Sequence, residues 1–208
     1  MYRPTDVVSS EDQLRQIHPE SFESQTRKVI SVIDPLCRIW IERSPFVSIT
    51  TVNAAGQVDV SPKGDPPGFV KVLDEKTLAI PDRPGNFRFD TFVNIIETGR
   101  IGLCFIIPKR SEVMRVNGSA QVVRDAALME QMAINGRVPP LAILVRVEEA
   151  FYHCGKAMIR SGMWRPESWA DVGDTPTYAE ALITHGKLDR TLDDMEDGIR
   201  RNEIERLY

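Results

Sequence analysis

SPKGDPPG occupies residues 61–68, and IPDRPGNFR follows at residues 80–88 after one short strand. In the first run, prolines fix φ and remove backbone donors while glycines permit positive φ. This predicts a stiff, irregular backbone that a ligand can approach closely. The second run adds the planar guanidinium groups of Arg83 and Arg88, which suit phosphate oxygens, while Lys63 and Asn86 supply further donors. Either run alone is also typical of a turn with solvated arginines, but together they predict an anion-binding site.

The chain has 208 residues, a net charge of −4 and an ordinary hydrophobic share of 42%. This length predicts a single domain, residues 1–208, with helical extensions at about 1–43 and 170–208. The acidic balance argues against nucleic acids and anionic membranes as partners, because both need clustered positive charge. The first residues lead into polar sequence without an apolar leader, and no segment approaches a membrane span. A cytoplasmic location is therefore expected.

Periodicity predicts helices at both ends of the chain and mainly strands between them. The strand-like segments are rich in β-branched and apolar residues, and the turn at 53–57 predicts a hairpin. A sheet of this kind is expected to close largely on itself. The expected strands are 46–52, 58–61, 69–73, 77–80, 101–107, 112–123 and 141–152, and the expected helices are 11–17, 24–33, 36–43, 89–98, 125–136, 178–183 and 188–207.

The expected helix at 89–98 begins directly after the second basic run, and Gly99 follows it as a C-cap. The N-terminus of a helix carries partial positive charge and free N–H groups. Its position beside Asn86 and Arg88 therefore strengthens the prediction of a phosphate site.

Three cysteines, Cys37, Cys104 and Cys154, are widely spaced and odd in number, which indicates a reducing compartment. Cys37 and Cys104 lie in apolar runs and are expected to be buried structural thiols. Cys154 follows His153 on an expected strand, where adjacent side chains point to opposite faces. A lining or core role for Cys154 is therefore favoured over catalysis.

Competing site motifs do not occur. The sequence has no GxxxxGK(S/T), no GxGxxG between a strand and a helix, and no GxSxG elbow, so nucleotide triphosphatase, Rossmann and hydrolase sites are not supported. The three histidines are far apart, with no HExxH and no paired cysteines, so no metal site is predicted.

Several motifs follow one another in a specific order. The strand at 46–52 ends at Asn53-Ala54-Ala55-Gly56, and SPKGDPPGF, TLAIPDRPGNFRFDTFVNI, RIGLCFIIP, RVNGSA and a late tryptophan come after it. Over about residues 20–170 the sequence resembles the pyridoxamine 5′-phosphate oxidase-related flavoproteins, in particular the branch with SPKGDPPGF and PDRxGN motifs. The resemblance implies a mainly β (α+β) fold, the FMN-binding split β-barrel, which is an antiparallel Greek-key barrel with flanking helices.

The resemblance also implies a homodimer with FMN at the subunit interface. The isoalloxazine ring would lie along 61–67 and the phosphate near 81–88, with Lys156 and Arg160 beside the pocket mouth. The partner subunit would contribute Arg115, Asn117 and Trp164, although Trp164 could instead pack at the interface and Arg115 could pair with a carboxylate. The implied cofactor-binding residues are Ser61, Pro62, Lys63, Gly64, Asp65, Pro81, Arg83, Asn86, Arg88, Arg115, Asn117 and Trp164.

The function implied by the resemblance is an FMN-dependent oxidoreductase that transfers hydride or electrons through flavin N5 to or from an unidentified small molecule. The chain lacks the late arginine-x-histidine element of pyridoxamine 5′-phosphate oxidases, and Arg160-Ser161-Gly162 does not replace it, so vitamin B6 oxidase activity is not expected. The cofactor carries the chemistry of a flavin enzyme, so no catalytic residue is assigned. Two alternatives stay open. One is a flavin, deazaflavin or haem-binding or sensing protein without turnover, although no strong histidine ligand supports haem. The other is a cofactor-free interaction protein.

Overall fold

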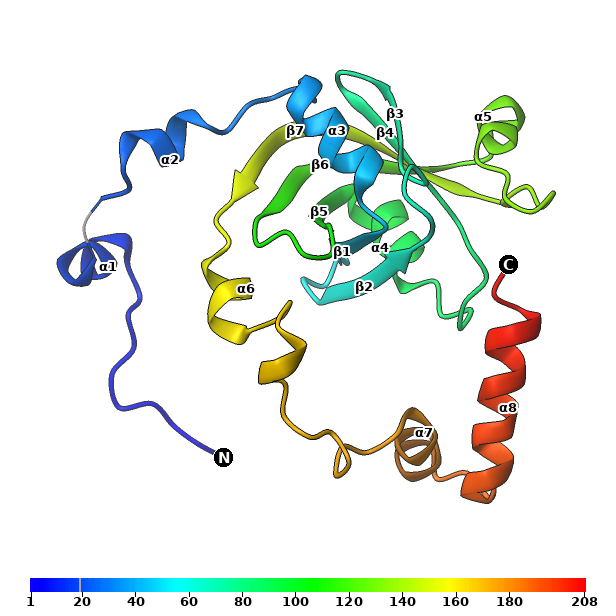
Figure 1. The fold of residues 1–208 in the computed structure, drawn as a ribbon. Coiled ribbons are helices and arrows are strands. Elements are labelled where there is room, and N and C mark those ends of the chain that lie inside the picture. The colour runs from blue at the N-terminus through cyan, green and yellow to red at the C-terminus, as the bar shows by residue number, and fades with distance from the viewer. Residues whose placement is uncertain (19) are drawn as a thin grey trace.

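The computed structural model describes residues 1–18 and 20–208, and its centre is a seven-stranded antiparallel sheet that curls around a hydrophobic core (Figure 1). The strand order is β2-β1-β5-β6-β7-β4-β3, so β2 and β3 form the two edges. With its flanking helices, the sheet confirms the expected α+β class. The strands are β1 (Phe46–Val52), β2 (Val58–Gly64), β3 (Lys71–Asp74), β4 (Thr77–Pro81), β5 (Arg100–Ile106), β6 (Val113–Val123) and β7 (Ala142–His153).

Alternation along the strands determines which side chains fill the core. In β1, Val47 and Ile49 are fully buried while the residues between and beside them are not. β5 repeats the pattern with Ile101, Leu103 and Phe105. Successive side chains of a strand point to opposite faces, so each strand gives one face to the core and the other to the outside. Burial of each large apolar side chain contributes about 1.5–3 kcal/mol.

β2 continues through Ser61, Pro62 and Lys63 to Gly64, which corrects the expectation of an irregular backbone from residue 61 onward. Pro62 pairs with Ser48 of β1. A proline cannot donate to a ladder, but an edge strand has one side that needs no donors. The irregular part of the motif therefore begins only where the chain leaves the sheet, at Asp65.

α4 (Asp90–Thr98) packs against β1, β2, β5 and β6. Its buried Asn94 donates from Nδ2 to Oγ1 of Thr51 at 3.0 Å, and Thr98 Oγ1 donates to the Val52 carbonyl at 2.8 Å. The helix ends at Gly99, which has a φ of 65° and donates its N–H to the Ile95 carbonyl. The helix and the glycine cap predicted from the sequence are both confirmed.

The region before the barrel differs from the sequence prediction. The expected helix at 24–33 is wrong beyond α2 (Glu23–Arg27), because Ile30 instead pairs with Ala150 as an antiparallel bridge. Its N–H donates to the Ala150 carbonyl at 3.0 Å, and its carbonyl accepts from the Ala150 N–H at 2.7 Å. Pairing with β7 thus overrides the local helical periodicity. α3 (Pro35–Arg43) then begins at the capping carboxylate of Asp34.

Two further expected elements are shorter or shifted. β3 begins at Lys71 rather than Phe69, although Phe69 and Val70 are both buried in the core. α5 (Ala126–Gln131) is confirmed with Asp125 as its N-cap, but it ends before the expected residue 136. A tight turn replaces its last part, because Ile134 and Arg137 pair with each other.

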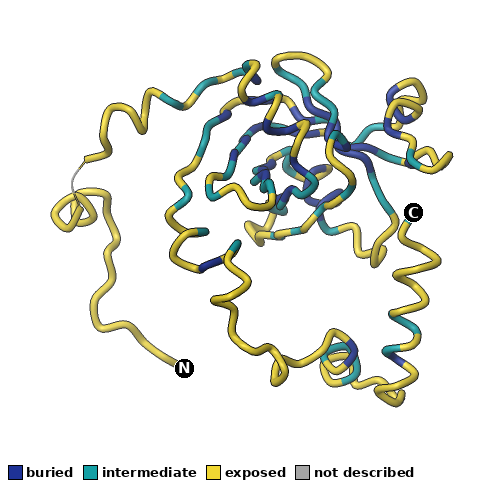
Figure 2. Tube along the Cα trace, in the orientation of Figure 1, coloured by how far each residue is buried: buried dark blue, intermediate teal, exposed yellow. Residues whose placement is uncertain are grey.

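The remaining helices lie outside the barrel, and Figure 2 shows that most of their surface is exposed. α7 and α8 pack on each other. None of the helices in residues 1–18 and 20–208 is long and apolar enough to cross a membrane. These outer elements are α1 (Glu11–Ile17), α2, α6 (Lys156–Ser161), a 3-10 turn (Pro166–Ser168), α7 (Tyr178–Gly186) and α8 (Leu192–Glu205).

Candidate functional site

A cavity of about 580 Å³ opens between β2 and the segment that links β4 to α4. This volume lies in the range of about 300–1,000 Å³ that is common for small-molecule sites. The lining combines cations, carboxylates and aromatic rings, and it consists of residues 59–63, 82–92 and Pro140. The two sequence runs that predicted an anion site therefore meet at one cavity.

Most of the cofactor-binding residues predicted within those runs line this cavity, namely Ser61, Pro62, Lys63, Arg83, Asn86 and Arg88. Gly64 ends β2, and Asp65 lies buried behind Arg83. Pro81 is buried in β4, where it pairs with Ala142, and the described lining of the cavity does not include it.

Asp65 is the buried carboxylate behind the cavity wall, with a side chain only 1% exposed. Its Oδ2 accepts from Nε of Arg83 at 2.6 Å, and its Oδ1 accepts from the hydroxyl of Tyr208 at 2.8 Å. Nη2 of Arg83 also donates to the Met132 carbonyl at 2.9 Å. These contacts hold the guanidinium of Arg83 in a fixed position in the wall.

Sequence reasoning missed both Tyr208 and Met132 as partners in this cluster. Tyr208 is 143 residues from Asp65, and Met132 is 49 residues from Arg83. No local spacing could reveal contacts over such separations. The only sequence signal was an aromatic residue just beyond the last expected helix.

The loop that carries Arg88 has an unusual backbone. Phe87 and Phe89, on either side of Arg88, both have a φ of 60°. A non-glycine residue in the left-handed region costs about 1–3 kcal/mol, and such residues cluster at active sites, ligand clamps and switch regions. Arg88 donates from Nε to Oδ2 of Asp90 at 2.6 Å, which raises the pKa of Arg88 and lowers that of Asp90.

α4 presents its N-terminus to the cavity. Phe89 is the N-cap, and no described side chain caps the helix there. Thr91 and Phe92 of the first turn line the cavity, and Thr91 Oγ1 donates to Oδ2 of Asp59 at 3.0 Å. The uncapped N–H groups and the helix dipole therefore favour a negative ligand at this end.

The charges of the lining are balanced. Burial raises the pKa of Asp82, while the positive charges of Lys63 and Arg83 oppose that shift. Arg83 and Arg88 are already in ion pairs, whereas the ammonium of Lys63 makes no hydrogen bond or ion pair with a described residue. Lys63, the start of α4 and the free Nη1 of Arg83 are thus the groups available to an incoming anion. The lining cations are Lys63, Arg83 and Arg88, and the lining carboxylates are Asp59, Asp82 and Asp90.

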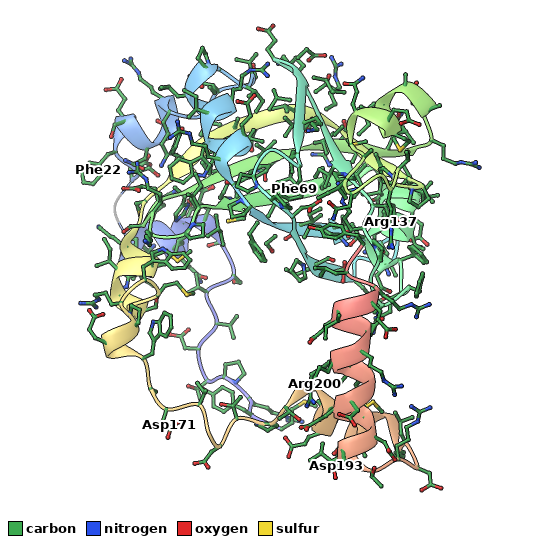
Figure 3. All side chains as sticks on the ribbon, turned by 45° about the vertical axis from the view of Figure 1, so that its right-hand side comes forward. Phe22, Phe69, Arg137, Asp171, Asp193 and Arg200 are labelled. Carbon is green, nitrogen blue, oxygen red and sulfur yellow. The ribbon has the colours of Figure 1, made fainter. Side chains whose placement is uncertain are left out.

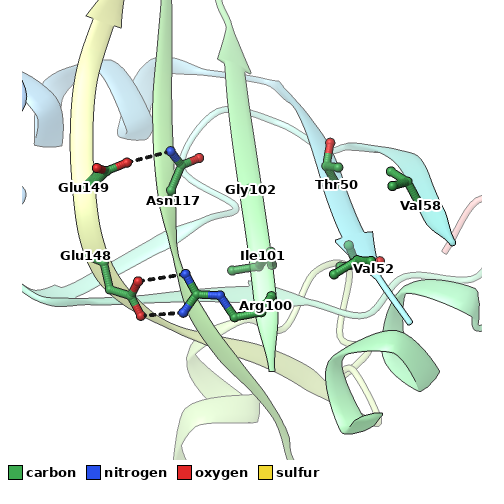
Figure 4. Close-up of a pocket in the computed structure, with 10 residues that line it drawn as sticks. Thr50, Val52, Val58, Arg100, Ile101, Gly102, Asn117, Glu148 and Glu149 are labelled. Carbon is green, nitrogen blue, oxygen red and sulfur yellow. Dashed lines mark hydrogen bonds and ion pairs between the residues drawn. The ribbon is translucent and has the colours of Figure 1, made fainter. Parts of the chain in front are cut away.

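A second cavity, of about 660 Å³, lies on the outer face of the sheet over β1, β5 and β6 (Figure 4). Asn117 lines it and donates from Nδ2 to Oε2 of Glu149 at 2.9 Å. Arg100 forms a two-point ion pair with Glu148, at 3.0 and 2.9 Å. The predicted residue Asn117 therefore lies on a different surface from Lys63 and Arg88 of the same subunit.

The two other residues predicted to come from a partner subunit are also engaged within their own chain. The guanidinium of Arg115 lies 5.0 Å from the ring centre of Phe151. Trp164 donates from Nε1 to the Arg110 carbonyl at 2.8 Å. The described lining of the first cavity includes neither residue, so their contribution from a partner stays a prediction.

The three cysteines differ in exposure. Cys37 is buried as expected, and burial with the neighbouring Asp34 raises its pKa to about 12. Cys104 is half-buried rather than buried as expected, and this burial raises its pKa also. Cys154 is exposed, which corrects the expected core role, and the described linings of the two cavities do not include it. β7 ends at His153, so Cys154 lies outside the sheet. Among residues 1–18 and 20–208, no group of three His, Cys, Asp or Glu side chains is close enough to hold a metal ion.

One thiol is expected to react rapidly with Ellman's reagent in the folded protein, because only Cys154 is exposed and a thiolate must form first. Cys154→Ser should remove the fast phase, and Cys104→Ser should leave it unchanged. Unfolding should release all three thiols. A fast phase that survives Cys154→Ser would contradict the burial of Cys37 and the half-burial of Cys104.

The profile of the pyridoxamine 5′-phosphate oxidase family matches residues 33–154, which is more than half of the chain. The chain belongs to this family. The match spans β1 to β7 and α4, so it includes both basic runs and the first cavity. The family resemblance predicted from the sequence is therefore confirmed. A comparison with curated proteins found no match.

Three solved structures are similar to this chain over somewhat more than half of its length. A putative pyridoxamine 5′-phosphate oxidase from Lactobacillus delbrueckii is 20% identical, with a TM-score of 0.46 over 59% of this chain and 95% of that one. HupZ from Group A Streptococcus is 23% identical, with a TM-score of 0.48 over 58% and 93%. The haem storage protein HutZ from Vibrio cholerae is 11% identical, with a TM-score of 0.43 over 59% and 94%.

Proposed function

We propose that this protein is an FMN-dependent oxidoreductase that acts on a small molecule. The observation that carries the proposal is the first cavity, where Lys63, Asn86 and Arg88 meet the uncapped N-terminus of α4 in a member of the pyridoxamine 5′-phosphate oxidase family. Cationic side chains and a helix N-terminus are suited to a phosphate ester.

The residues of the cavity fit FMN. Lys63 and the first N–H groups of α4 would bind the phosphate, since the Phe89 side chain does not cap the helix and the Lys63 ammonium makes no hydrogen bond or ion pair with a described residue. The edge strand from Ser61 to Lys63 offers one flat wall against which the ring system can lie. When bound, FMN supplies hydride or electron transfer at its N5 atom. The protein holds the cofactor, orients the ring and excludes water from its buried face.

The proposed assembly is a homodimer with FMN at the subunit interface. Support comes from the outer face of the sheet, where Val58 and Val60 of β2 are 67% and 63% exposed. This apolar pair adjoins the second cavity, which Val58 and Asn117 both line. Packing of a second subunit on this face would bury the valines and bring Arg115, Asn117 and Trp164 toward the partner's cofactor. Apolar surface removed from water would stabilise the dimer.

The absorption spectrum of the purified protein tests the cofactor assignment. After incubation with FMN and gel filtration, flavin bands are expected to elute with the protein, at about twice the chain mass of 23.5 kDa. Lys63→Ala should weaken FMN binding about 10–100-fold, because it removes one charge-assisted contact worth about 1.5–3 kcal/mol. Titration of FMN fluorescence measures the two dissociation constants.

Lys28→Ala is the matched control. The ammonium of Lys28 donates to Gln25 in the N-terminal arm, so its loss should leave FMN binding unchanged. A wild-type protein that retains no FMN would refute the proposed function. Retained FMN that no nicotinamide or small-molecule donor reduces would instead support a flavin-binding or sensing protein without turnover. A monomer that binds FMN as tightly would refute the shared site.

A further inference from the structure

The helical arm that follows the barrel returns to the candidate site at Tyr208. α7 and α8 expose most of their surface and bury only Ala179 and Met195 (Figure 2). α8 then ends beside the barrel, as Figures 1 and 3 show. There the hydroxyl of Tyr208 donates to Asp65 at 2.8 Å. A residue distant in sequence thus completes the group of contacts behind the cavity wall.

The two oxygens of Asp65 have separate partners. Oδ1 accepts from Tyr208, and Oδ2 accepts from Nε of Arg83 at 2.6 Å. Because both oxygens are engaged, the plane of the carboxylate is fixed. Arg83 in turn lines the cavity, and its Nη1 has no hydrogen bond to a described residue. The orientation of this free nitrogen therefore depends on Asp65, and that of Asp65 depends on Tyr208.

The electrostatics agree with this arrangement. The pKa of Tyr208 lies above its usual range, first because its hydroxyl donates to Asp65, and the positive charge of Arg83 opposes the shift. The hydroxyl is therefore a protonated donor at neutral pH. Loss of the hydroxyl would leave one carboxylate oxygen without a partner in a side chain that is 1% exposed. Such a carboxylate would rotate toward water and take the guanidinium with it.

We propose that Tyr208 is a positioning residue of the site, which acts through Asp65 to aim Arg83 at the anionic part of the bound ligand. This inference rests on the proposed function, in which the ligand is FMN. It also gives the α7–α8 arm a role, since the arm is the element that brings Tyr208 to the barrel.

The rate of FMN release from the 208-residue chain tests the proposal. Tyr208→Phe should release FMN about tenfold faster, as expected for loss of one hydrogen bond to a charged group, with little change in the unfolding temperature. Tyr178→Phe is the matched control, because Tyr178 lies on the same arm and is 62% exposed. Equal release from the two variants would overturn the proposal.

A double-mutant cycle separates positioning from a merely structural effect. If Tyr208 acts through the fork of Arg83, Tyr208→Phe should add almost nothing in an Arg83→Lys background. The same tenfold effect in both backgrounds would refute a path through Arg83.

If the wild type binds no FMN, the proposed function fails. The rate of hydrogen exchange at residues 81–88 then tests whether Tyr208 positions the basic loop. Faster exchange in Tyr208→Phe than in Tyr178→Phe supports the positioning role, and equal exchange overturns it.

Discussion

Asp65→Ala is expected to lower the free energy of unfolding by about 3–5 kcal/mol, because it leaves the charge of Arg83 without its buried partner. The carboxylate is 1% exposed, and the side chain of Arg83 is only 16% exposed. Water can therefore replace little of the lost interaction. The substitution also removes the acceptor for Tyr208. Denaturant-induced unfolding of the wild type and the variant measures the difference.

Two further variants make this result specific. Asp65→Ala combined with Arg83→Met should recover much of the loss, because no unpaired charge then remains buried. Asp197→Ala breaks the exposed ion pair between Asp197 and Arg200, and it should cost less than about 1 kcal/mol. If Asp65→Ala were as mild as Asp197→Ala, the buried ion pair behind the cavity would be absent in solution.

The position of Asp65 changes the interpretation of the SPKGDPPG run. Its N–H donates to the Pro45 carbonyl at 3.1 Å, where the chain leaves β2, and its side chain fixes Arg83. The family resemblance implied a position along the flavin ring for this residue, and that position stays a prediction. The structure gives it a defined task in the protein itself, which is to tie the end of the edge strand to the basic loop. The conformation of the site thus depends on the carboxylate of Asp65 as well as on the predicted cations.

Local signals in the sequence predicted the elements that local contacts stabilise. The turn at Asn53 and Gly56 gave the β1–β2 hairpin, because the Asn53 side chain accepts from backbone N–H groups within the turn. Gly99 ended α4 as predicted, since a glycine adopts positive φ at no steric cost. The basic runs predicted the position of the cavity, because the second run directly follows β4 and its Arg83 pairs with Asp65 of the first run.

Contacts between distant segments could not be predicted in this way. Residues 28–33 have helical periodicity, yet Ile30 is drawn into a bridge with Ala150 of β7. The sequence assigned no role to Asp59 and Asp82, and only the fold places them in a cavity with Lys63. The sequence therefore predicted the cations of the site and Asp65, and it missed the carboxylates that line the cavity with them. That balance depends on how strands and loops meet in space, which spacing along the chain does not encode.

Gly118→Ala is expected to destabilise the barrel by about 3 kcal/mol, because a Cβ at this position has no room. An ideal Cβ would lie 2.0 Å from the carbonyl oxygen of Arg146, which belongs to the backbone of β7 and cannot turn aside. The ladder between β6 and β7 shifts register at this point, between Asn117 and Gly118. A forced separation of the strands would therefore also disturb Asn117 and the second cavity.

Gly198→Ala in α8 is the control, since nothing lies within 4 Å of its Cβ, and alanine should stabilise the helix by up to about 1 kcal/mol. The denaturant midpoint should be highest for Gly198→Ala, lower for the wild type and lowest for Gly118→Ala, which would support the close approach of β6 and β7 at this register shift. An unaltered midpoint for Gly118→Ala would refute it.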